Sequence, residues 1–271
     1  MSIFTNMISQ FNSISIRIKS AGIIAMCVLL TTVSCRYKER TLTVTPEPPY
    51  PQYGSLTVRL SNEAGGVPVA PGSGSYTNAA GNVYTVDMLK YYVSNFTLIK
   101  SDNTEHNFAN YKLINAEDTS TCSFTLDSVA NGNYKAIRFY LGVDSAHNHS
   151  LVNEGDLNAS NGMVWTWSTG YIFFKHEGIF HNDTGGTSIL LYHYGVDDNL
   201  KTVDIPVSEF EVSADRKVMY LKFDLNKLYG NPNVINFNGN GIHQSLDSKD
   251  RVWLGQMKAN FSSAFIFDKV Q

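Results

Sequence analysis

Histidine and tryptophan side chains gather in one stretch of the sequence and could carry metal chemistry. His147 and His149 stand two apart where a predicted core strand runs out into a loop. Two histidines at this spacing can both reach one metal ion only in extended or irregular backbone, and imidazole ligands suit copper, zinc or nickel. Trp165 and Trp167 follow and would share one face of an extended segment. These two indoles could instead fill a core or stack on a sugar ring.

A third histidine, His193, lies at the end of a strand-like segment, just before a glycine. Alternation places it on one strand face with Ile189 and Leu191. An imidazole at the edge of an apolar face needs a partner, either a hydrogen-bonding group or a metal ion. The residue pattern alone leaves both open.

Familiar catalytic motifs are absent from the sequence. It has no Gly-x-Ser-x-Gly elbow, no His-Glu-x-x-His, no phosphate-binding Gly-x-x-x-x-Gly-Lys, and no Gly-x-Gly-x-x-Gly after a strand. No nucleophile, base and orienting group fall at a recognisable spacing. Cys122 has no histidine near it in sequence and is predicted to be a small buried hydrophobe. We therefore expect a binding protein, not an enzyme.

The N-terminal residues predict export and a lipid anchor. Arg17 and Lys19 precede an apolar run over residues 21–33, which is too short to cross a bilayer and is typical of a signal peptide. The run ends in a small residue directly before Cys35, as in a bacterial lipobox, whose cysteine receives the lipid. We therefore expect a periplasmic or cell-surface lipoprotein on a bacterial membrane, with the outer membrane favoured.

Composition narrows the class of partner. The chain has 271 residues, with 21 Lys and Arg against 24 Asp and Glu, for a formal net charge of -3. This balance does not supply the concentrated basic surface that nucleic-acid binding needs. Charged residues make up 17% and aromatic residues 12%, which permits a large core and excludes global disorder.

Beyond a proline-rich stretch, alternating apolar and polar residues dominate. Short runs of this kind, separated by Asn-, Gly- and Ser-rich turns, predict an all-β fold: an antiparallel β-sandwich with long loops and one short C-terminal helix. The helix is expected from Asp250, with Val252, Trp253, Met257 and Phe261 packed against the sheet. The expected divisions are a signal peptide (1–34), a lipidated Cys35 with a proline-rich tether (35–52), and a β-sandwich domain (53–271).

Several segments, taken in order, resemble the MbnP-like copper-binding protein family. The likeness rests on residues 141–150 (LGVDSAHNHS), on the M-x-W-x-W-x-x-G-Y run over 163–171, on Tyr-His-Tyr-Gly at 192–195, and on the closing segment 257–267. It spans about residues 55–270, nearly all of the expected domain. The sequence looks closest to the lipoprotein branch of that family.

This resemblance implies an extracytoplasmic β-sandwich that binds copper through histidines near a tryptophan. In characterised relatives a partner di-haem peroxidase-like enzyme oxidises one tryptophan to kynurenine. Carried over by position, His149 and His193 would be copper ligands, and Trp165 or Trp167 would be the modified residue. The resemblance does not settle the third ligand, for which the candidates are His147, which we include in the expected site, His176 and His243.

A second interpretation needs no copper. Trp165, Trp167 and nearby tyrosines could stack on a glycan in a binding or adhesion module. The carboxylates of Asp144, Asp197 and Asp198 could then hold Ca²⁺ through oxygen ligands. Copper content would separate the two interpretations.

Overall fold

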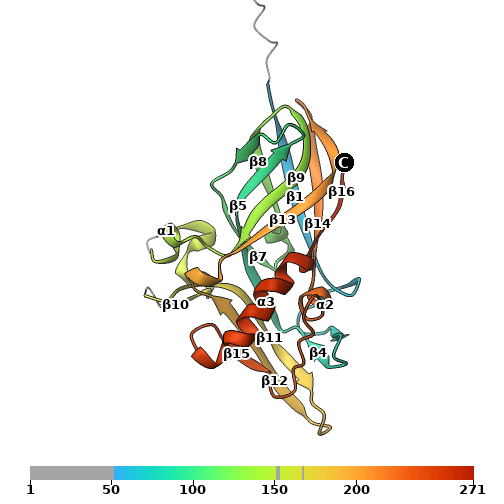
Figure 1. Cartoon of the computed structure of the whole chain (residues 1–271), viewed down its shortest axis with the longest axis vertical. Coiled ribbons are helices and arrows are strands. Elements are labelled where there is room, and N and C mark those ends of the chain that lie inside the picture. The colour runs from blue at the N-terminus through green and yellow to red at the C-terminus, as the bar shows by residue number, and fades with distance from the viewer. Residues whose placement is uncertain (1–51, 151–152, 167) are drawn as a thin grey trace, which may run out of the picture. The chain divides into compact units, whose positions relative to one another are not determined.

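Strands dominate the part of the chain that the structure, a computed structural model, describes: residues 52–150, 153–166 and 168–271 (Figure 1). These residues belong to one compact unit. The predicted signal peptide, Cys35, the tether up to residue 51 and Trp167 lie outside the described residues. Within the described part, no helix is long and apolar enough to cross a membrane.

The smaller sheet has five strands built around β1. Its order is β16 (Phe265–Val270), β14 (Arg216–Asp224), β1 (Tyr53–Ala64) and β2 (Val67–Pro68), with β8 (Ser123–Ala130) also paired to β1. Leu56, Val58 and Leu60 of β1 are all buried, as their alternation predicts. The β1–β14 pair is parallel, a pairing between distant segments that alternation cannot indicate.

The larger sheet has eleven strands and carries the candidate site. Its main order is β13 (Lys201–Val212), β9 (Gly132–Leu141), β5 (Met88–Lys100), β11 (Gly170–His181), β12 (Thr187–Gly195) and β15 (Ile242–Gln244). Shorter strands extend it: β3 (Ser75–Thr77), β4 (Val83–Thr85), β6 (Glu105–Asn107), β7 (Tyr111–Asn115) and β10 (Val164–Thr166). Its described pairs are antiparallel except β12–β15. The prediction of a mainly antiparallel all-β fold is confirmed.

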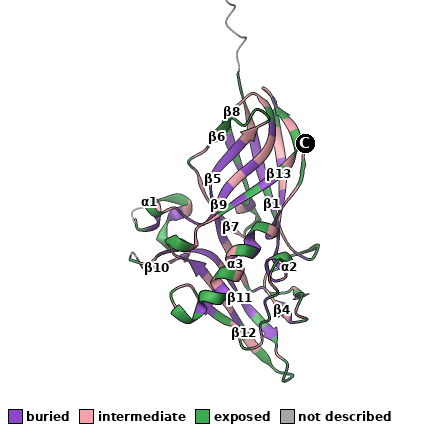
Figure 2. Ribbon diagram, viewed as in Figure 1, coloured by how far each residue is buried: buried purple, intermediate pink, exposed green. Residues whose placement is uncertain are grey.

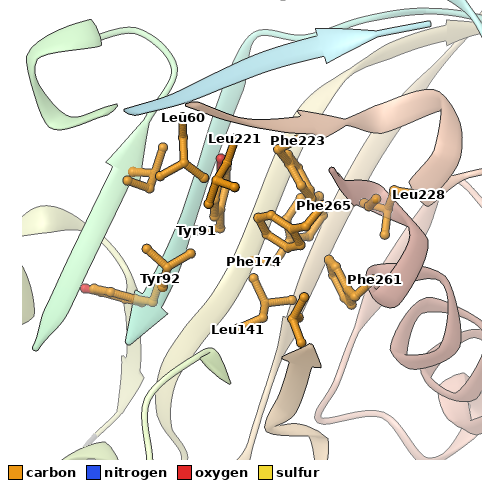
Figure 3. Close-up of a cluster of buried hydrophobic side chains, with 14 of the residues drawn as sticks. Leu60, Tyr91, Tyr92, Leu141, Phe174, Leu221, Phe223, Leu228, Phe261 and Phe265 are labelled. Carbon is orange, nitrogen blue, oxygen red and sulfur yellow. The ribbon is translucent and has the colours of Figure 1, made fainter. Parts of the chain in front are cut away.

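The two sheets share one aromatic core (Figure 3). Tyr91 and Phe174 come from the larger sheet, Phe223 and Phe265 from the smaller one, and Phe261 from the C-terminal helix. The ring centroids of Tyr91 and Phe223 lie 4.6 Å apart, and those of Phe174 and Phe261 lie 5.4 Å apart. Burying each side chain contributes roughly 1.5–3 kcal/mol. Buried residues alternate with half-buried ones along residues 137–141 of β9 and with exposed ones along residues 202–206 of β13 (Figure 2), as expected of a sheet with one wet face.

The C-terminal helix α3 (Arg251–Ala264) lies across the strands and packs against β13 and β14 (Figure 1). Trp253, Met257 and Phe261 are buried at intervals of four residues, as predicted. The prediction for Val252 was wrong, since that residue is 74% exposed. It precedes the buried stripe by one position, about 100° around the helix, and therefore faces solvent.

Two single-turn helices complete the described fold, α1 (Ser145–Asn148) and α2 (Leu225–Leu228). Asp224 caps α2, and its Oδ1 accepts hydrogen bonds of 2.9 Å from the backbone N–H groups of Asn226 and Gly65. This nearly buried carboxylate therefore ties the helix start to the turn after β1.

We expect Asp224→Ala to lower the free energy of unfolding by about 1–2 kcal/mol, because a helix cap and a second backbone partner are lost together. Urea denaturation measures the difference. The matched control is Asp118→Ala, which removes an exposed cap from the short 3₁₀ turn Thr119–Cys122 and should have a smaller effect. Equal losses in the two variants would contradict the importance of the buried double contact.

Candidate functional site

The two loop histidines lie on one helical turn, not on an extended loop. α1 follows β9; Asp144 caps it by accepting a hydrogen bond from the backbone N–H of His147, and His149 is the residue that ends it. His147 and His149 then have different partners, on β7 and beyond β12 respectively. The helical turn explains why the two imidazoles do not share a partner.

His147 belongs to a small polar cluster. Its Nδ1 lies 2.8 Å from Tyr111 Oη and 3.1 Å from Asp144 Oδ1. Burial, reinforced by the neighbouring Asp144 carboxylate, raises the pKa of Tyr111 to about 12. Burial alone would raise the pKa of Asp144, but hydrogen bonds from Tyr111, His147 and Asn95 outweigh it and lower that pKa. The cluster therefore contains a carboxylate that holds one nitrogen of His147.

His149 is held by Asp197, in the 3₁₀ turn Asp197–Asn199 that follows β12. His149 Nε2 lies 3.0 Å from Asp197 Oδ2, and the amide of the fully buried Asn148 donates to Asp197 Oδ1 at 2.5 Å. Asn148 Oδ1 in turn accepts a 2.7 Å hydrogen bond from the backbone N–H of Tyr171. This chain connects α1, β11 and the turn after β12, and it fixes the partner of His149.

His193 also has a carboxylate partner. Its Nε2 lies 2.8 Å from Glu177 Oε1 on the neighbouring β11, and Glu177 also pairs with Lys175 at 3.2 Å. Burial lowers the pKa of His193, against the opposing effect of Glu177, and this favours the neutral imidazole. The expected apolar face around His193 is not buried, since Ile189 is 59% exposed; the buried face of β12 carries the alternate residues instead.

Trp165 packs against the end of β12. It lies on β10, and a Cβ built on Gly195 would come within 2.8 Å of the Trp165 ring. A glycine at this position therefore permits the indole to approach the strand. Trp165 is half-buried, and its Nε1 has no hydrogen-bond partner among the described residues.

The segment 193–197 thus gathers three of the predicted site residues from separate elements. It contains His193, contacts Trp165 at Gly195, and binds His149 through Asp197. In the described part of the chain, no group of three or more His, Cys, Asp or Glu side chains is arranged to hold a metal ion. The structure brings the predicted residues to one strand end without completing a ligand set.

Comparison with known proteins decides the family. The family model named MbnP matches residues 53–245, which is more than two thirds of the chain. The chain belongs to the MbnP family. The solved structure of MbnP from Methylosinus trichosporium is similar, with 16% identity and a TM-score of 0.49, covering 68% of this chain and 80% of that one. Among curated proteins, none matches.

The matched MbnP region includes every predicted ligand but stops before α3. Of the other third-ligand candidates, His176 is fully buried, and both of its ring nitrogens have partners, Tyr229 Oη and the Thr85 carbonyl. His243 lies on β15, and its Nδ1 pairs with Asp250 at 2.8 Å. Membership of the lipoprotein branch stays a prediction.

Sequence reasoning missed the carboxylates that orient the histidines. The register of β11 and β12 places Lys175 directly opposite His193. Glu177, two residues further along the same face of β11, is therefore a diagonal neighbour and reaches His193. The calcium-binding interpretation used Asp197, but its two carboxylate oxygens contact Asn148 and His149. No spacing in the sequence indicates either pairing.

Proposed function

We propose that this MbnP-family protein is an extracytoplasmic copper-binding lipoprotein that holds copper near the end of β12. His149 and His193 are the proposed ligands, and Trp165 is the neighbouring indole. One observation supports this above the others: His149, Trp165 and His193 come from different elements and all contact or belong to the segment 193–197.

The donors fit copper by type and by orientation. His149 and His193 each have Nε2 on a carboxylate, and neither Nδ1 has a hydrogen bond within the described residues. Ligating histidines generally bond their second nitrogen to a carboxylate or carbonyl, which fixes the ring and raises its basicity. Copper binds imidazole well. We leave His147 out of the proposed ligand set, because it and His149 lie on one helical turn and are held by different carboxylates, Asp144 and Asp197.

In this proposal the chain's own residues orient the ligands. Asp197 and Glu177 accept hydrogen bonds and hold their imidazoles in the tautomer that leaves Nδ1 as a lone-pair donor. Asn148 fixes Asp197, and Trp165 excludes water from one side. We propose binding, not catalysis.

Metal content tests the proposal. The full-length chain, expressed with its own leader and added copper, should carry near-stoichiometric copper by elemental mass spectrometry. His149→Ala and His193→Ala should each lower copper affinity by about tenfold or more, as loss of a ligand or its support does. The control is His181→Ala, which removes an exposed histidine at the end of β11. Copper content unchanged in both ligand variants would overturn this site.

Oxidation of a tryptophan by a di-haem peroxidase-like partner stays a prediction. Intact mass of the same sample would report ring opening, and peptide mapping would assign it to Trp165 or Trp167. No feature of the described residues favours the glycan-stacking alternative, because Trp165 packs against Gly195. A folded protein that carries no copper would support the glycan-stacking alternative instead.

A further inference from the structure

β15 lies at the edge of the larger sheet, beside the start of α3 (Figure 1). Side chains of β15 and of the residues around it line a groove. It consists of three cavities of about 700, 510 and 290 Å³. The first and second share Ile242, Lys249 and Asp250, and the first and third share Asn240, His243 and Lys249. The cavities therefore adjoin, and we call them together the β15 groove.

Two buried ring nitrogens without partners belong to this groove. His243 stacks on Trp253 with centroids 4.8 Å apart and planes within 14°, and both rings line the 290 Å³ cavity. His243 Nε2 and Trp253 Nε1 are buried, and neither has a hydrogen bond within the described residues. A buried polar group without a hydrogen bond is unfavourable, so a ligand that satisfied both nitrogens would be favoured.

Asp250 determines the hydrogen-bonding role of His243 Nε2. This carboxylate is 1% exposed; its Oδ1 lies 2.8 Å from His243 Nδ1, and its Oδ2 accepts from the Gln244 backbone N–H. His243 Nδ1 therefore carries the proton, which leaves Nε2 as a hydrogen-bond acceptor. Trp253 Nε1 is a donor only. The groove thus presents one acceptor and one donor.

Apolar side chains concentrate along the same groove. Eight large apolar residues are exposed in the described part of the chain, and five of them line these cavities. Those five are Ile189, Val234, Ile242, Leu246 and Val252. Exposed apolar residues gathered in one place mark interaction surfaces, whereas scattered ones do not.

We propose that the β15 groove binds an extended peptide segment with apolar side chains. A peptide amide carries both groups the stacked rings lack: its N–H donates to His243 Nε2 and its C=O accepts from Trp253 Nε1. The apolar residues contact alternate side chains, as in other extended-peptide sites. Lys249 and Val252, whose side chains are exposed, line the same 290 Å³ cavity as the two rings. This proposal is independent of copper.

The probe is an equimolar mixture of capped hexapeptides, acetyl-X-Thr-X-Thr-X-Thr-amide, with X as Val, Ile, Leu or Phe. It is added at about 1 mM, which would reveal even weak binding, to the metal-free full-length chain. The readout is the Trp253 indole N–H resonance, assigned by its loss in Trp253→Phe. We expect a dose-dependent shift of that resonance.

Three variants test the contacts. His243→Asn keeps a donor for Asp250 but removes the Nε2 acceptor, and Ile242→Asn removes an apolar contact; each should weaken binding about tenfold, the equivalent of a lost hydrogen bond or apolar anchor. Val67→Asn is the matched control, since Val67 is 56% exposed against 55% for Ile242 and lies on β2. No shift of the Trp253 resonance, or equal weakening in the Val67 variant, would refute the proposal.

Discussion

Replacing Gly170 with alanine is expected to lower the free energy of unfolding by about 3–5 kcal/mol. Gly170 begins β11 with φ at +80°, where a residue with a Cβ is disfavoured by about 1–2 kcal/mol. The new Cβ would also overlap the side-chain amide of Asn148. Asn148 is fully buried and bonded to both Asp197 and the Tyr171 backbone, so moving it leaves polar groups unsatisfied, at about 1–3 kcal/mol each.

Gly162→Ala isolates the backbone part of this effect. Gly162 has φ at +71°, but a Cβ there would meet nothing within 4 Å. This control should lose only about 1 kcal/mol, within the range for a left-handed residue. Urea denaturation of both variants gives the comparison. If the two losses were equal, the Asn148 amide would have to be free to move, and the rigid link between α1 and Asp197 would be wrong.

Alternation in the sequence predicted most strands because it reports which face of each strand is buried. It does not report which strands pair, so the parallel β1–β14 and β12–β15 pairs could not be foreseen. Alternation also does not fix where one element ends and the next begins: Ser263 and Ala264 complete the final turn of α3, and β16 begins directly at Phe265. Local residue pattern cannot divide a segment whose apolar residues suit both elements.

The candidate site was predicted less completely. The sequence indicated His149, His193 and Trp165, and the structure places them around one strand end. Their carboxylate partners were not foreseen, because Glu177 and Asp197 reach them only through strand register and a turn after β12. The His243–Trp253 stack was missed for the same reason, since it joins an edge strand to a helix. Residue type suggests chemistry, whereas tertiary pairing decides which nitrogen is free.

His176 should make the protein acid-sensitive. This imidazole is fully buried; its Nε2 donates to the Thr85 carbonyl at 3.1 Å and its Nδ1 accepts from Tyr229 Oη at 2.5 Å. Burial lowers its pKa from 6.5 to about 4, although the Thr85 carbonyl and nearby Glu177 oppose the shift. Both nitrogens of the neutral ring therefore have hydrogen bonds. A proton on Nδ1 would displace the hydrogen bond that Tyr229 Oη donates.

The sign of the effect follows from which state binds the proton first. Above pH 6.5 the ring is neutral in both states, so its contribution is fully present; between pH 6.5 and about 4 only the unfolded chain takes up the proton, and stability is lost as pH falls. A shift of this size corresponds to about 3 kcal/mol. Urea denaturation gives the free energy of unfolding at pH 7 and at pH 4. Its decrease between the two pH values should be about 3 kcal/mol smaller in His176→Gln than in the wild type, whatever the absolute stability of the variant. His181→Gln, which changes an exposed histidine on the same strand, should keep the wild-type drop, and a wild-type drop in His176→Gln would contradict the assignment.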